Sequence, residues 1–149
     1  MNHSTDTSTL NDLIQVLNDG KSFYEEAAPK VRADLGTVFQ RMARTKAAIV
    51  SDLQGAVKSA GETPAESGTF AGSVRKLYAD VRTSLSSKPD AEYVTQLEEF
   101  EDRILAEFRN AVEKSDDASV RAIAARHLPN VTRDHDDMRA LKQIEAAHG

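Results

Sequence analysis

The chain has 149 residues, 40% of them hydrophobic and 29% charged, and it contains no cysteine. This length suits one domain with a single core, and the lack of cysteine excludes disulfides, thiolate metal sites and cysteine nucleophiles. The net charge of −5, from 19 basic and 24 acidic residues, opposes nucleic-acid binding, which needs a clustered basic surface.

The N-terminal half predicts two long amphipathic helices. Residues 1–8 are polar and lack the features of a leader segment, so we expect a flexible segment there and a cytoplasmic protein. Apolar residues then follow at spacings of three and four, which predicts a first helix over about 9–28 that ends before Pro29. A second helix is expected from Asp34, a favoured cap residue, to the residue before Gly61.

The stretch from Gly61 to Pro89 is too long for a hairpin turn between helices, and it has an amphipathic pattern of its own. Its apolar residues at helical spacing are Phe70, Val74, Leu77, Tyr78, Val81 and Leu85. We therefore expect a short amphipathic helix within a long crossover between the second and third helices. Such a crossover allows these two helices to run parallel, as they do in ferritin-like bundles.

Two further amphipathic patterns complete the predicted bundle. The third helix is expected to begin near Pro89, and the fourth after Ser115-Asp116-Asp117. Only a short turn separates them, so they should pack antiparallel. The prediction is an all-α fold, with residues 9–148 forming a single ferritin-like, up-down-down-up four-helix bundle.

Short motifs lie in a distinctive order along nearly the whole chain. They are Leu10-Asn11-Asp12-Leu13-Ile14, Asp19-Gly20 followed by Phe23 to Ala28, Gly68 to Ser73, Glu99-Phe100-Glu101-Asp102, and Arg133-Asp134-His135-Asp136 followed by Arg139. In order and spacing these motifs resemble a bacterial family of small, functionally uncharacterised ferritin-like four-helix bundles, a domain of unknown function. The resemblance implies the fold, a bacterial origin and a loose association with stress responses among related ferritin-like proteins. It implies no established activity or ligand set.

The di-metal site that this fold often carries requires particular ligands. Di-iron bundles use a Glu from each of two helices and a Glu-x-x-His from each of the other two. His127 and His135 have Ala124 and Thr132 in place of that glutamate. The second helix has Lys46 in the middle of its inward face, which puts a cation where a metal would lie. These residues argue against a standard di-iron centre.

Two polar residues, Glu101 and His135, nevertheless fall on apolar helix faces, three or four residues from apolar neighbours. One interpretation is a buried ionic network of Lys21, Lys46, Glu101 and His135 that fixes the helix alignment. Another is a metal site in which Glu101, His135 and nearby carboxylates bind iron or manganese. A third is that both side chains are exposed at the edge of the bundle.

Basic residues in the predicted crossover helix suggest a different kind of site. Arg75, Lys76 and Arg82 form a basic patch in an acidic chain. An amphipathic helix with basic polar residues can bind an anionic membrane surface or a protein partner. The simpler interpretation is that the apolar face of this helix closes the bundle.

The residues favour a non-catalytic function. We expect a bacterial, stress-associated protein without a cofactor, which acts as a homo-oligomer or by binding a protein partner. The first alternative is a metal-binding ferritin-like protein, an oxidase or iron store with a degenerate carboxylate and histidine site. The second alternative is peripheral membrane binding through the basic crossover helix.

Overall fold

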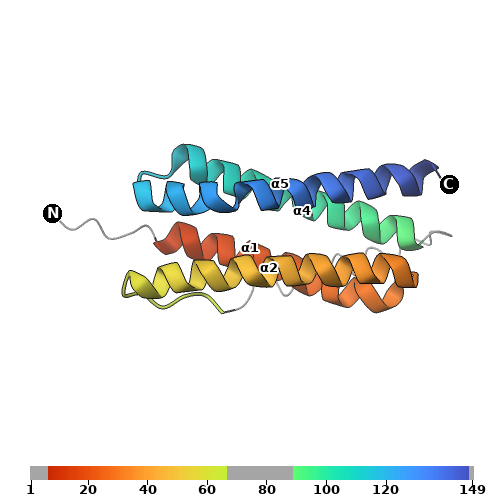
Figure 1. Ribbon diagram of the computed structural model, residues 1–149, viewed down its shortest axis with the longest axis horizontal. Coiled ribbons are helices and arrows are strands. Elements are labelled where there is room, and N and C mark those ends of the chain that lie inside the picture. The colour runs from red at the N-terminus through yellow and green to blue at the C-terminus, as the bar shows by residue number, and fades with distance from the viewer. Residues whose placement is uncertain (1–6, 67–88, 148–149) are drawn as a thin grey trace.

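The structure, a computed structural model, describes residues 7–66 and 89–147, and four long helices account for most of them (Figure 1). The elements are α1 (Thr7–Ala27), the short 3₁₀ helix η1 (Ala28–Lys30), α2 (Ala33–Ser59), α4 (Pro89–Lys114) and α5 (Ala118–Ala147). No strand occurs among the described residues, so the predicted all-α class is confirmed. None of these helices combines the length and apolar character needed to cross a membrane.

The helix boundaries differ from the predicted ones mainly at the N-terminus. Helix α1 begins at Thr7, so residues 7 and 8, which fall in the predicted flexible segment, are helical. The first N–H groups of a helix have no partner within it, and threonine or serine hydroxyls can bond nearby backbone groups there. The predicted crossover helix lies within residues 67–88, outside the described part of the chain.

Pro29 and Gly36 set the corner between α1 and α2. Pro29 lies at the start of η1, where its fixed φ suits a helical turn, and the backbone becomes extended at Val31, with φ −116° and ψ 170°. Gly36 packs against this corner, because a Cβ placed on it would lie 2.6 Å from the Ala28 carbonyl oxygen. A larger residue at position 36 would force the corner apart.

The four helices associate in two pairs. Helix α1 packs along α2 and α4 packs along α5, while α1 and α4 join the pairs. In Figure 1, α1 and α5 run from left to right and α2 and α4 from right to left, so each pair is antiparallel. Arg32, at the corner after α1, contacts both helices of the other pair: Asp90 Oδ2 of α4 at 3.6 Å and the Glu145 carboxylate of α5.

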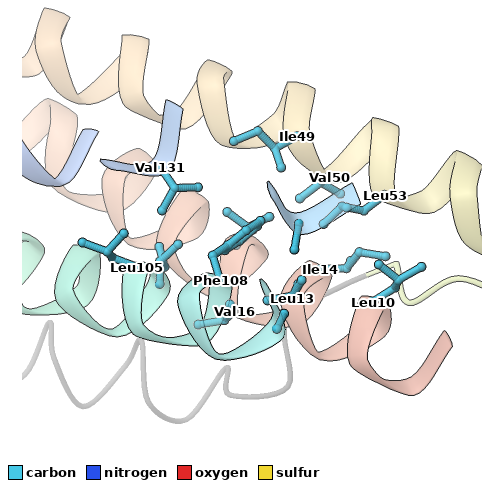
Figure 2. Close-up of a cluster of buried hydrophobic side chains, with 14 of the residues drawn as sticks. Leu10, Leu13, Ile14, Val16, Ile49, Val50, Leu53, Leu105, Phe108 and Val131 are labelled. Atoms are coloured by element: carbon cyan, nitrogen blue, oxygen red, sulfur yellow. The ribbon is translucent and has the colours of Figure 1, made fainter. Parts of the chain in front are cut away.

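Two apolar clusters fill the bundle, one on each side of its middle. The first comes from residues 10–17, 49–57, 100–111 and 120–131, and Figure 2 shows Leu10, Phe108 and Val131 of this cluster on three different helices. The second comes from residues 23–28, 35–43 and 93–97 together with Met138. Between the two clusters, buried polar residues replace the apolar ones on all four helices. They are Asp19, Lys46, Glu101 and Asp134.

The two glycines of α2 predict opposite effects of substitution by alanine. Gly36→Ala should lower the free energy of unfolding by about 1–3 kcal/mol, because the new methyl group overpacks the corner. Gly55→Ala should raise it by about 0.5–1 kcal/mol, because a methyl group at position 55 would meet nothing within 4 Å and alanine favours the helix. Urea unfolding of both variants measures the difference. Equal effects at the two positions would contradict the close approach at Gly36.

Candidate functional site

The centre of the buried polar layer is Lys46 of α2. Its side chain lies on the same face as Met42 and Ile49, at the helical spacing that defines the buried stripe, and the residue is only 1% exposed. The Lys46 ammonium lies 2.6 Å from Glu101 Oε2 of α4 and 3.3 Å from Asp134 Oδ2 of α5. A buried charge is tolerated only when it is paired and hydrogen-bonded, and these two carboxylates provide the pairing.

Tyr24 of α1 completes the cluster. Its hydroxyl donates a short hydrogen bond to Glu101 Oε2, the same oxygen that accepts from Lys46. The Lys46 ammonium also lies 5.0 Å from the centroid of the Tyr24 ring, within the range of a cation–π interaction. All four long helices of the described structure therefore meet around one ammonium group, and we call Tyr24, Lys46, Glu101 and Asp134 the buried cluster.

Burial shifts the pKa of two members of this cluster. Tyr24 is completely buried beside the Glu101 carboxylate, and both effects raise the pKa of its hydroxyl well above 10. Burial also raises the pKa of Asp134, against the opposing attraction of the Lys46 ammonium, while the Glu101 charge adds to the rise. Tyr24 thus remains a hydrogen-bond donor at neutral pH.

Gly20 of α1 makes room for the lysine. A Cβ on Gly20 would lie 3.4 Å from Lys46 Cε and 3.0 Å from Ile104 Cδ1. Because 3.0 Å is tighter than ordinary van der Waals contact, even a methyl group here would press on the residues packed around the lysine. The glycine in the Asp19-Gly20 motif therefore has a packing role in the polar layer.

His135 lies next to Asp134 in sequence but in a different environment. Its Nε2 is 2.5 Å from Asp102 Oδ1 of α4, and its Nδ1 is 3.1 Å from Asp136 Oδ1. Burial is the largest single influence on the His135 pKa and lowers it, but the hydrogen bonds to Asp136 and Asp102 together outweigh burial and raise the pKa above 6.5. Neighbouring helical residues point about 100° apart, which explains why Asp134 binds Lys46 and His135 binds Asp102.

The structure places the predicted site residues in three locations. Lys46 and Glu101 come together in the buried cluster, whereas His135 bonds to Asp102 and Asp136. The prediction that Lys21 joins the buried network is wrong: its side chain is 34% exposed and pairs with Glu25 at 3.7 Å. It follows Gly20 by one residue, so it points away from the face that Gly20 presents to Lys46. The predicted docking residues Arg75, Lys76 and Arg82 lie outside the described residues.

The sequence pattern did not reveal two members of the buried cluster, Tyr24 and Asp134. Tyr24 fits the apolar stripe of α1, so its hydroxyl gave no separate signal. Asp134 lies three residues after Val131 and four before Met138, while His135 lies four after and three before them. Both spacings fit one helix face, so the pattern alone did not decide which of the two residues faces the core.

The buried cluster does not fit a pair of metal ions. Its two carboxylates already bind the Lys46 ammonium, and His135, the histidine nearest in sequence, bonds to Asp102 instead. The chain does have one Glu-x-x-His, from Glu145 to His148 at its C-terminal end. Glu145 binds Arg32 at the corner of the bundle, and His148 lies outside the described residues.

The match to a known family covers three of the four long helices. Residues 6–114 match the family described as "Domain of unknown function (DUF2383)". The chain belongs to this family. The matched range includes Tyr24, Lys46 and Glu101 and ends at Lys114, before α5, so Asp134 and His135 lie beyond it. A comparison with curated proteins found no match to this chain.

Removing the buried ammonium should destabilise the protein strongly. We expect Lys46→Met to lower the free energy of unfolding by about 3–5 kcal/mol, because it leaves the Glu101 and Asp134 carboxylates buried without a cation. Lys21→Met removes a lysine from a partly exposed ion pair, so it should change the free energy of unfolding by no more than about 0.5 kcal/mol. Urea unfolding at neutral pH compares the two variants. Similar losses from both would refute the central role of Lys46.

Asp134 should give the protein a measurable pH dependence. Its pKa is raised in the folded protein, so its contribution to stability is complete below its ordinary pKa of 3.8 and is lost as the pH rises through the raised value. Asp134→Asn lacks this titration. The free energy of unfolding of the unmodified chain, minus that of the variant, should therefore fall as the pH rises above the ordinary pKa of 3.8. A difference that rises with pH would show that attraction to Lys46 outweighs burial.

Proposed function

We propose that this chain is a non-catalytic ferritin-like bundle in which a buried ammonium replaces the metal pair. The observation that carries the proposal is the position of Lys46, which lies between Glu101 and Asp134 in the middle of the core. A divalent ion could bind these carboxylates only by displacing the ammonium or by lying next to it, and the two cations would repel each other. The parallel direction of α2 and α4 in Figure 1 supports the ferritin-like assignment.

The burial of the cluster also supports a non-catalytic role. Tyr24, Lys46 and Glu101 are at most 1% exposed, and Asp134 is 7% exposed. An open groove of about 630 Å³ lies between α2 and α5, lined by Ala48, Ser51, Asp52, Gly55, Ala56, Ser59, Ile123 and Arg126. None of the buried cluster lines this groove, so a molecule bound there would not reach the cluster.

A bundle with a closed core of this kind acts through its surface. We therefore propose that the protein functions by self-association or by binding a protein partner in the bacterial cytoplasm. The association with stress responses rests on the resemblance to ferritin-like stress proteins. An iron store or oxidase with a degenerate site is the alternative, and the buried ammonium disfavours it.

The association hypothesis predicts that the purified full chain is larger than one chain in solution. Light scattering after size-exclusion chromatography, at several protein concentrations, should give the mass of a dimer or a larger oligomer. If the protein is a monomer at every concentration, and affinity capture enriches no partner over a matched control bait, the hypothesis fails.

The non-catalytic part of the proposal is tested by iron loading. Under anaerobic conditions the chain should not bind two Fe²⁺ ions in its core, and after exposure to air it should not oxidise Fe²⁺ faster than buffer does. The control is the double variant Glu98→Gln/His135→Gln. Glu98 of α4 pairs with Lys142 and His135 of α5 with Asp102, so this variant removes two possible ligands outside the buried cluster and none within it. Uptake of two ions that persists in this variant but is lost in Glu101→Gln would overturn the proposal.

A further inference from the structure

A second group of polar side chains lies where α4 and α5 pack together, outside the buried cluster. Glu98 and Asp102 are four residues apart on α4, so they share one helix face, and His135 approaches them from α5. The three residues each offer one ligand atom, and these atoms lie within 4.8 Å of one another. We call Glu98, Asp102 and His135 the flank cluster.

The flank cluster is partly buried and has one open side. Glu98 and His135 are only 6% and 8% exposed, whereas the Asp102 side chain is 55% exposed. The two buried residues give the cluster fixed positions on two different helices. The exposed carboxylate gives an ion from solvent a direct path to it.

The imidazole of His135 is oriented as it is in many metal sites. Asp136 Oδ1 lies 3.1 Å from Nδ1, so Nδ1 can donate its proton to this carboxylate and leave the lone pair of Nε2 for another group. Nε2 faces Asp102 Oδ1 at 2.5 Å. A carboxylate that accepts from one ring nitrogen while the other nitrogen binds a cation is the usual support for a metal-binding histidine.

We propose that the flank cluster binds one divalent transition-metal ion. Glu98 and Asp102 each supply a carboxylate oxygen, His135 supplies Nε2, and water fills the remaining positions. One nitrogen and two oxygen donors suit ions such as Zn²⁺, Fe²⁺ and Mn²⁺. Metal bonds of about 2.0–2.2 Å hold neighbouring ligand atoms about 3 Å apart, so rotation of the two carboxylates brings the cluster to this spacing.

Lys142 is the cation that a metal ion must compete with. Its Nζ lies 3.3 Å from Glu98 Oε2, and its side chain is 43% exposed. An exposed lysine can move into solvent at small cost, because surface ion pairs contribute little. The exposure of its lysine distinguishes the flank cluster from the buried cluster, where the Lys46 side chain is 2% exposed and cannot move into solvent in the same way.

The proposed ion differs from a di-iron centre in number and place. Its three ligands include neither Glu101 nor Asp134, so a metal can bind while the buried cluster remains intact. It would join α4 to α5 and thereby stabilise their packing, because a ligand that binds only the folded state raises its stability. The inference therefore goes beyond the proposed non-catalytic function and does not depend on it.

The test is calorimetric titration of the full chain, without a histidine tag and freed of metal by a chelator, with Zn²⁺ and with Mn²⁺. We expect one ion per chain, with Zn²⁺ binding tighter than Mn²⁺. His135→Gln and Glu98→Gln should each weaken Zn²⁺ binding at least tenfold, and Asp136→Asn by about 10–100-fold. Lys142→Gln should strengthen Zn²⁺ binding, because it removes the cation that competes for Glu98. A purely structural role of the flank cluster does not predict this gain.

Two controls separate the flank cluster from other histidines. His127 also contacts a carboxylate, with Nε2 2.5 Å from Asp52 Oδ2, but it belongs to no group of three ligands among the described residues. His127→Gln should leave Zn²⁺ affinity unchanged, and so should the double variant His3→Gln/His148→Gln. Circular dichroism shows whether each variant is folded. If His135→Gln does not fold, Asp102→Asn, which changes the exposed ligand, replaces it in the titration.

Some results would overturn the proposal. It fails if the unmodified chain shows no saturable binding, or if the folded Asp102→Asn and Glu98→Gln variants bind Zn²⁺ as tightly as the unmodified chain. It also fails if His127→Gln or the terminal double variant abolishes binding. Failure would leave the non-catalytic proposal standing, since that proposal is tested by iron uptake in the buried cluster and by the mass in solution.

Discussion

The structure depends on keeping one ammonium group charged inside an apolar core. Removing Lys46 from water costs several kcal/mol, which is recovered only if well-placed partners surround it. Glu101 and Asp134 come from the other helix pair, so these ion pairs favour the alignment of the two pairs that brings all three residues together. A slip of α4 by one turn, about 5.4 Å, would carry Glu101 out of reach of Lys46 and leave the Glu101 carboxylate buried without that cation.

The same interaction limits the chemistry of the core. The Glu101 oxygen that binds Lys46 also accepts the Tyr24 hydroxyl, so this oxygen already has two donors. A carboxylate held in this way stabilises the fold but is not free to act on a substrate or a metal. This is the physical basis for proposing a function at the surface of the bundle.

Two neighbouring residues of α5 have different roles for a geometric reason. Asp134 and His135 differ by about 100° around the helix; the first therefore points to Lys46 and the second to α4, where it meets Asp102. The two clusters can thus bind different cations. The buried cluster binds the Lys46 ammonium, and the flank cluster, by our proposal, binds a metal ion. Because each cluster has its own carboxylates, a change in one need not disrupt the other.

The sequence by itself determined the four long helices of the described structure and the inward position of Lys46, because apolar spacing and proline act locally along the chain. It did not determine which polar groups meet. Asp134 and His135 fit the inward stripe equally well, and the pattern placed Lys21 in the buried network although its side chain is partly exposed. Contacts between helices depend on how each helix is rotated and aligned against the others. Packing of the two apolar clusters and the ion pairs of Lys46 together set that arrangement, so only the tertiary structure decided that Tyr24 and Asp134 join Lys46 and that His135 contacts Asp102 instead.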